Sequence, residues 1–234
     1  MCGRFVSTSP PAALAGAFGA ELSEEVASRP EPPRWNVAPT ARIYAVVGSP
    51  RRLEARRWGL VPSWAKDPSV GRRHVNARAE GLADRPAYRS ALARRRCLIP
   101  ADGFYEWSRP PAEAGSQRRP PAQPFFFGPR DGSGPLALAG LWEAWRDGEG
   151  SVLLTATIVT TAANRVVGQV HDRMPAILGP EAWSAWLDTD TVGPSDARAL
   201  LGPAPDELLV AWPVGPAVNS PRNEGPGLLE PAGP

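Results

Sequence analysis

The apolar positions of this chain fall in short runs, and proline or glycine separates most of these runs from the next. Runs rich in β-branched and aromatic residues predict strands at 42–47, 56–60, 97–100, 104–107, 125–127, 136–142, 152–161 and 208–212. Stretches with helical spacing or a proline start predict helices at 11–18, 86–93, 161–168, 180–187 and 195–201. Trp183, Trp186 and Leu187 lie at i, i+3 and i+4 and should face the core. Many short strands with few helices predict an α+β fold, with a mainly antiparallel, barrel-like sheet and peripheral short helices.

The length of 234 residues and the absence of an internal repeat favour one domain, which we expect to span residues 1–223. Residues 108–124 are rich in proline, arginine and small side chains and predict an exposed, flexible loop. Residues 224–234 are rich in proline and glycine, and we expect a disordered tail there.

The composition indicates a folded globule, because 42% of the residues are apolar and nine are tryptophan. Two cysteines and two histidines provide neither a disulfide framework nor a zinc-binding cluster, so we expect no metal and no cofactor. The N-terminus lacks the charged and apolar regions of a signal peptide, and no run approaches 18 apolar residues. A cytoplasmic monomer that does not engage a membrane is the expectation.

The net charge is only +2, but it is unevenly distributed. Residues 51–100 contain 13 lysine or arginine residues against four acidic ones, so the rest of the chain is acidic. Such a zone attracts phosphate, which arginine binds in a bidentate way. A solvated, arginine-rich surface explains the same charge equally well.

Cys2 follows the initiator Met1 directly. Removal of Met1 would leave a free α-amine and a thiol on adjacent carbons. With an aldehyde, the amine forms an imine and the sulfur closes on the same carbon, giving a five-membered thiazolidine that an internal cysteine cannot make. The alternative is that a cysteine at position 2 is accidental and Met1 is retained, and position alone does not decide between the two.

Other polar residues lie in segments whose remaining residues are typical of strands and turns. Glu106 lies between aromatic residues in an apolar strand, an environment that tends to raise a carboxyl pKa and to suit proton transfer, unless the residue is exposed. His171 can act as an acid, a base or a hydrogen-bond donor, or belong to a surface turn. Asn36 and Asn76 could be turn or capping residues, and for Asn36 the structural interpretation is favoured. Trp64 is more often a core residue than a platform for a base.

Six motifs in order along the chain resemble the SOS response-associated peptidase (SRAP) family. They are Met1-Cys2-Gly3-Arg4-Phe5, Asn36-Val37-Ala38-Pro39, Trp58-Gly59-Leu60-Val61-Pro62, Asn76-Ala77-Arg78-Ala79-Glu80, Asp102-Gly103-Phe104-Tyr105-Glu106-Trp107 and His171-Asp172-Arg173-Met174-Pro175. The family usually has a lysine near its last strand motif, where this chain reads Val218-Asn219-Ser220-Pro221-Arg222-Asn223.

The resemblance implies a role in the DNA-damage response, in which the protein cross-links abasic sites in single-stranded DNA through a thiazolidine and protects them. Cys2 would be the double nucleophile, and Glu106 would move protons during sugar ring opening and imine formation. Asn76 would hold the N-terminal residue or the sugar. His171 would contact the sugar oxygen and assist ring closure or reversal.

The resemblance also implies a DNA-binding surface, and action on DNA would bring the protein to the nucleoid. Arg4, Arg78 and Arg173 would hold phosphates, whereas Pro39 and Trp64 would pack against the flanking bases. Two other functions stay open at this point. The chain could be a cysteine-type peptidase or autopeptidase that uses its N-terminal cysteine, or a module that binds single-stranded DNA without covalent capture.

Overall fold

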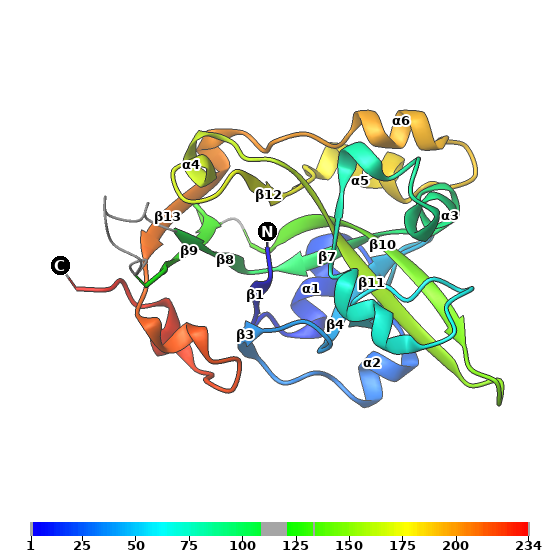
Figure 1. Ribbon diagram of the computed structural model, residues 1–234, viewed down its shortest axis with the longest axis horizontal. Coiled ribbons are helices and arrows are strands. Elements are labelled where there is room, and N and C mark those ends of the chain that lie inside the picture. Colours follow the sequence, from blue (N-terminus) through cyan, green and yellow to red (C-terminus); the bar gives the residue numbers. More distant parts are fainter. Residues whose placement is uncertain (1, 109–120, 133, 234) are drawn as a thin grey trace, which may run out of the picture.

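The structure is a computed structural model that describes residues 2–108, 121–132 and 134–233. Its centre is a ring of five strands (Figure 1). Neighbours along the ring pair antiparallel in the order β11-β10-β7-β4-β5, and a parallel pairing between β5 and β11 closes it. The five strands are β4 (Arg42–Val47), β5 (Arg52–Trp58), β7 (Arg96–Ala101), β10 (Leu136–Arg146) and β11 (Val152–Ala162).

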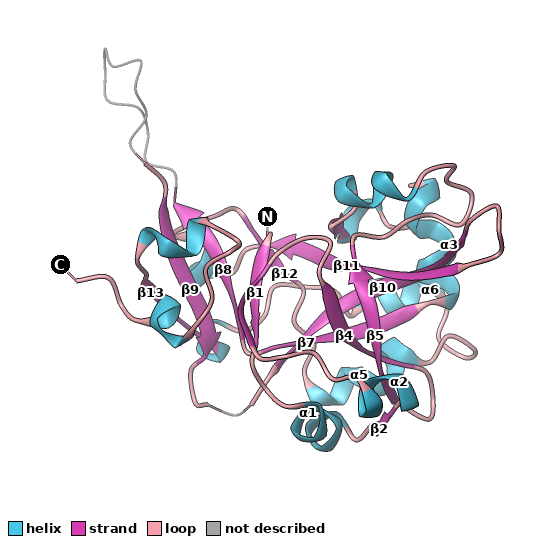
Figure 2. Cartoon of the chain, turned by 90° about the horizontal axis from the view of Figure 1, so that it is seen from below, coloured by secondary structure: helices cyan, strands magenta, loops and turns pink. Residues whose placement is uncertain are grey.

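A second, antiparallel sheet lies on one side of the barrel, as Figure 2 shows. Its strand order is β13-β9-β8-β1-β3. The hairpin of β8 and β9 places β8 next to the N-terminal strand β1, so this sheet positions the start of the chain. The strands are β1 (Arg4–Ser7), β3 (Arg34–Val37), β8 (Gly103–Ser108), β9 (Gln123–Pro129) and β13 (Leu209–Pro213).

Short strands and helices surround the barrel. β2 (Glu21–Leu22) pairs with β5, while β6 (Asn76–Arg78) and β12 (Arg173–Pro175) both pair with β11. The α-helices are α1 (Pro11–Phe18), α2 (Glu24–Ser28), α3 (Pro86–Arg94), α4 (Arg165–Gly168), α5 (Pro180–Leu187) and α6 (Pro194–Ala199). Single 3₁₀ turns are η1 (Pro68–Arg73), η2 (Ala79–Gly81), η3 (Asp206–Leu208), η4 (Pro216–Asn219) and η5 (Pro226–Leu229). The structure therefore confirms the predicted α+β class with its barrel-like sheet.

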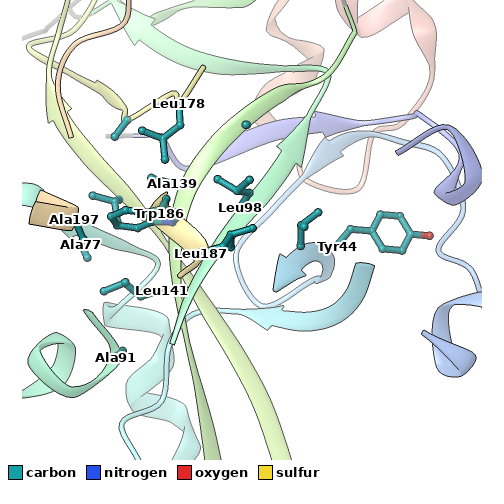
Figure 3. Close-up of a cluster of buried hydrophobic side chains, with 14 of the residues drawn as sticks. Tyr44, Ala77, Ala91, Leu98, Ala139, Leu141, Leu178, Trp186, Leu187 and Ala197 are labelled. Carbon is teal, nitrogen blue, oxygen red and sulfur yellow. The ribbon is translucent and has the colours of Figure 1, made fainter. Parts of the chain in front are cut away.

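Most of the barrel strands are apolar on both faces, and the exception is β5, which carries four charged residues among its seven. On β4, Tyr44 and Val46 pack in the cluster beneath the helices, whereas Ile43 and Ala45 pack in a second cluster that also contains Cys2. Burial on both faces explains why these strands are continuous apolar runs rather than alternating ones. The predicted inward face of α5 is confirmed, because Trp186 is fully buried in the first cluster (Figure 3).

The end of the chain differs from the disordered tail expected at 224–234. Residues 226–229 form the 3₁₀ turn η5, and Leu228 is buried beside Val214 and Val218. Val214 also forms a β-bridge with Pro231. Apolar contacts of Leu228 thus hold a segment whose composition alone indicated a free tail. Most of the loop predicted at 108–124 lies outside the described residues, and its last two positions belong to β9.

Candidate active site around the N-terminal cysteine

Cys2 lies two residues before β1, whose place in the molecule Figure 1 shows. β1 pairs with β8 on one side, through Arg4 and Tyr105, and with β3 on the other, through Phe5 and Val37. Cys2 has no exposed surface, and its thiol lies 3.9 Å from the Arg4 carbonyl oxygen. The N-terminal residue is therefore fixed by a central strand rather than carried on a free end.

Glu106 is the buried carboxylate of this site. It follows Tyr105 on β8, which places it beside the beginning of β1, and it is only 2% exposed. Burial raises the pKa of the Cys2 thiol far above its ordinary value, and the negative charge of Glu106 raises it further. The thiol is therefore neutral at neutral pH, and the structure brings Glu106 and Cys2 together as the sequence motifs predict.

Asn76 fixes the backbone of Cys2 from the barrel side. β6 pairs with β11 in parallel, with Asn76 opposite Ile158, and the Asn76 Nδ2 donates a hydrogen bond to the Cys2 carbonyl oxygen at 2.8 Å. Within the described residues, the buried Asn76 Oδ1 has no hydrogen-bond partner. Buried polar atoms without partners are rare in folded proteins, so this oxygen keeps an unused capacity to accept a hydrogen bond. This acceptor is available to a free α-amine or to a sugar hydroxyl.

His171 lies in the connection between α4 and β12. Figures 1 and 2 both place β12, which begins two residues later, beside the start of β1. The Arg173 backbone N–H donates to His171 Nδ1 at 2.9 Å, so in the neutral ring the proton sits on Nε2. Asp172 Oδ1 is 3.0 Å from the same Nδ1. The half-buried ring can serve as a donor to a group bound near Cys2.

The residues predicted to contact DNA lie in different environments. Trp64 is 66% exposed, so its large side chain is free for contact instead of belonging to the core. Pro39 is half-buried and precedes Thr40, whose φ of 75° turns the chain sharply. Arg78 is exposed at the end of β6, and Arg173 is largely buried at the start of β12.

Arg4 is already engaged inside the protein. Its NH1 donates to Asn36 Oδ1 at 2.7 Å and to the Val218 carbonyl oxygen at 2.9 Å. The Asn36 amide in turn donates to the carbonyl oxygens of Val218, Ser220 and Asn223 at 3.2, 2.9 and 3.1 Å. Asn36 is fully buried, so the structural role favoured from the sequence is correct. This link between the first strand and the end of the chain had no local signal in the sequence.

Part of the basic zone at 51–100 is structural. Arg96 is 1% exposed and donates to the carbonyl oxygens of Leu92, Trp186 and Val192, while Arg56 is 3% exposed and pairs with Glu54. The zone also contains exposed residues, which are Arg52, Lys66, Arg72, Arg73, Arg78, Arg85, Arg89 and Arg94. These exposed residues present their charge to solvent, where a phosphate can reach it.

No helix of the described residues is long and apolar enough to cross a membrane. In the same part of the chain, no three histidine, cysteine, aspartate or glutamate side chains gather as a metal site would require.

The fold and the site define an α+β barrel protein in which the cysteine at position 2 lies beside a buried carboxylate and the half-buried amide of Asn76. The chain belongs to the SOS response associated peptidase (SRAP) family, which matches residues 1–221. It is 38% identical over 232 residues to the abasic site processing protein YoqW of Bacillus subtilis, covering 98% of this chain and 99% of that protein. It is 35% identical over 212 residues to the abasic site processing protein HMCES of Rattus norvegicus, covering 79% of this chain and 58% of that protein. A crystal structure of a protein from Bacteroides thetaiotaomicron has the same fold, with a TM-score of 0.86 at 22% identity, over 99% of this chain and 100% of that one.

Proposed function

We propose that this protein captures abasic sites in single-stranded DNA by forming a thiazolidine with Cys2 after Met1 is removed. The observation that carries the proposal is the immobilised Cys2, with Glu106 beside it and the unpartnered Asn76 Oδ1 at its backbone. The names of the relatives support the class of substrate, since they are abasic site processing proteins.

The reaction begins at the α-amine. Its lone pair attacks the aldehyde carbon of the ring-opened sugar, and the resulting carbinolamine loses water to give a protonated imine. Glu106 would transfer the protons of sugar ring opening and water loss. Asn76 Oδ1 would accept a hydrogen bond from the amine and hold it toward the sugar.

Ring closure follows at the same carbon. The positive charge of the protonated imine lowers the pKa of the neighbouring thiol, which burial otherwise keeps neutral. The sulfur lone pair then attacks the imine carbon, the electrons of the C=N bond return to nitrogen, and the thiol proton passes to Glu106. His171 would donate from Nε2 to the sugar oxygen. The net change is one thiazolidine formed and one water released.

The DNA strand would cross the surface that carries the exposed Trp64 and Arg78. Stacking on an aromatic ring tolerates any base, and arginine neutralises phosphate, so such a surface binds single strands without regard to sequence. Pro39 would pack against a flanking base, and Arg173 would hold a phosphate beside His171. Arg4 would bind a phosphate while its guanidinium stays hydrogen-bonded to Asn36.

The same geometry weighs against a thiol peptidase as the main activity. A peptidase needs a thiolate, and both burial and the charge of Glu106 disfavour the thiolate form of Cys2. Hydrolysis of peptides by the Met1-processed protein, lost in Cys2→Ala, would contradict this preference. Equal binding of intact and abasic strands, indifferent to Cys2, would instead support a non-covalent binding module.

The test is a denaturing gel of Met1-processed protein incubated with a single-stranded oligonucleotide that carries one abasic site. We expect a heat-stable shifted band that is absent with an intact oligonucleotide and absent in Cys2→Ala. Cys97→Ala is the matched control, because Cys97 is the other cysteine and is equally buried. A Cys2→Ser variant should give a labile adduct, since oxygen closes a much weaker ring. A missing band with Met1 confirmed absent would remove the proposal.

A further inference from the structure

Glu80 and Arg173 form a bidentate ion pair. Arg173 NH1 lies 2.6 Å from Glu80 Oε1, and NH2 lies 3.0 Å from Oε2. Two parallel N–H···O bonds are also the arrangement in which arginine binds a phosphate group. In this structure the carboxylate of Glu80 thus occupies the same donors that a DNA phosphate would use.

The side chains of Arg173 and Glu80 differ in how tightly the surrounding protein holds them. The Arg173 side chain is 12% exposed, and its NH2 also donates to the Thr160 carbonyl oxygen at 2.6 Å, so the guanidinium is fixed. The Glu80 side chain is 60% exposed and follows β6 in the short turn η2. A ligand that competes for Arg173 therefore has to displace only a mobile carboxylate, and the donors stay in place.

The pair lies where the strand would pass. β6, which contains Asn76 and Arg78, and β12, which begins at Arg173, both pair with β11 near its end, around Thr160. Glu80 follows the first of these strands by two residues, and His171 precedes the second by two. The ion pair is therefore located between groups that belong to the site around Cys2.

A second arginine lines the groove that Glu80 borders. Glu80 lines a groove of about 390 Å³ together with Thr161, Ser195 and Arg198. Arg198 is exposed on α6, so its guanidinium can receive a carboxylate that leaves Arg173. The exchange of one arginine for another keeps the negative charge of Glu80 compensated.

We propose that Glu80 is a specificity-determining residue that occupies Arg173 in the free protein and moves toward Arg198 when a DNA phosphate binds. This inference rests on the proposed function, because it assumes that Arg173 binds the strand. An undamaged strand has to displace Glu80 and gains no covalent bond in return. An abasic strand displaces it once and is then held by the thiazolidine. Glu80 thus shortens the time that the protein spends on intact single strands.

The experiment measures the affinity of Met1-processed protein for an intact single-stranded oligonucleotide as a function of salt. Glu80→Gln removes the competing charge, and Glu149→Gln, in the exposed hairpin between β10 and β11, makes the same change of net charge elsewhere. We expect Glu80→Gln to bind about two to five times more tightly, the range for an exposed ion pair. Its salt slope should equal that of the unaltered protein, because Arg173 contacts one phosphate in both complexes. Glu149→Gln should leave both the affinity and the slope unchanged.

Arg198→Gln provides an independent test, in which the same affinity for the intact oligonucleotide is measured. It should weaken binding when Glu80 is present, because the displaced carboxylate loses its second partner, and it should have a much smaller effect in the Glu80→Gln background. Equal affinities for Glu80→Gln and Glu149→Gln, or equal effects of Arg198→Gln in both backgrounds, would overturn the inference. Capture of abasic strands by the unaltered protein would still stand in that case. Loss of that capture would instead remove the proposed function itself.

Discussion

The substitution Asn36→Ala should destabilise the protein by about 4 kcal/mol. Asn36 is fully buried and connects β1 to the end of the chain. Its Oδ1 accepts the hydrogen bond from the Arg4 guanidinium, a charged contact that contributes about 2 kcal/mol. Its two amide hydrogens are shared among the carbonyl oxygens of Val218, Ser220 and Asn223, and two such neutral bonds contribute about 1 kcal/mol each.

The assay is urea denaturation of Asn36→Ala, with thermal melting as a second measurement. For a chain of this size, a loss of about 4 kcal/mol corresponds to a fall of about 12 °C in the melting temperature. Asn219→Ala is the matched control, because Asn219 is exposed and accepts a single hydrogen bond, from Trp107 Nε1 at 2.7 Å. It should lose about 1 kcal/mol or less.

Asn36→Asp separates the contact that Oδ1 makes with Arg4 from the contacts that the amide nitrogen makes with the C-terminal carbonyl oxygens. It keeps an acceptor for Arg4 but places a second oxygen against three carbonyl oxygens, so it should be no more stable than Asn36→Ala. If Asn36→Ala lost no more stability than Asn219→Ala, the claim that Asn36 holds the C-terminal segment would be wrong.

Three further predictions follow from the site and the core. Glu106→Gln should speed alkylation of Cys2 at mildly alkaline pH. Removing the nearby negative charge lowers the raised pKa of the thiol and so increases its thiolate fraction. An alkylation rate that has the same pH dependence in the variant and the unaltered protein would refute this. Arg96→Ala should cost several kcal/mol, on the order of 3 to 5, because the carbonyl oxygens of Leu92, Trp186, Asp188 and Val192 lose their donor, and exposed Arg94→Ala should leave the urea midpoint unchanged. Trp64→Ala should weaken binding of intact single strands by about 1 to 3 kcal/mol without changing the melting temperature, and an equal loss of stability would indicate a core role instead.

The strand pattern was predictable because the barrel strands are buried on both faces. Continuous apolar runs such as those of β7 and β10 are easily recognised, and their existence as strands was confirmed. The pairing of β5 with β11 that closes the barrel joins residues almost a hundred positions apart. Nothing in either run specifies that partner.

Trp58 and Trp64 illustrate a different limit of sequence-based prediction. Trp58 is fully buried, packs edge-on against Phe5 and donates from Nε1 to the Val75 carbonyl oxygen, whereas Trp64, six residues later, is 66% exposed. Trp58 precedes Gly59 and Trp64 follows Pro62 by two residues, so the local sequence does not distinguish the two rings. Only the tertiary position of each ring decides which one packs in the core and which one is free for a ligand.

The sequence shows how many basic residues the zone at 51–100 contains, but it does not show which of them are buried and which are exposed. Arg96 and Arg56 are as basic as Arg78, yet backbone carbonyl oxygens and Glu54 satisfy them in the interior. The network of Asn36 with the C-terminal segment was equally hidden, because its partners lie more than 180 residues away. Long-range polar contacts have no local pattern.

The intact mass of the cross-linked species tests the central claim most directly. Met1-processed protein and an abasic single strand should give a single adduct whose mass is the sum of the two components less one water. That water leaves when the imine forms, and closure to the thiazolidine leaves the mass unchanged, so the stability of the adduct distinguishes the ring from the open imine. The adduct should persist without a reducing agent, and peptide mapping should locate it at Cys2. An adduct that survives in Cys2→Ala, or that needs reduction of an imine to become stable, would contradict the account.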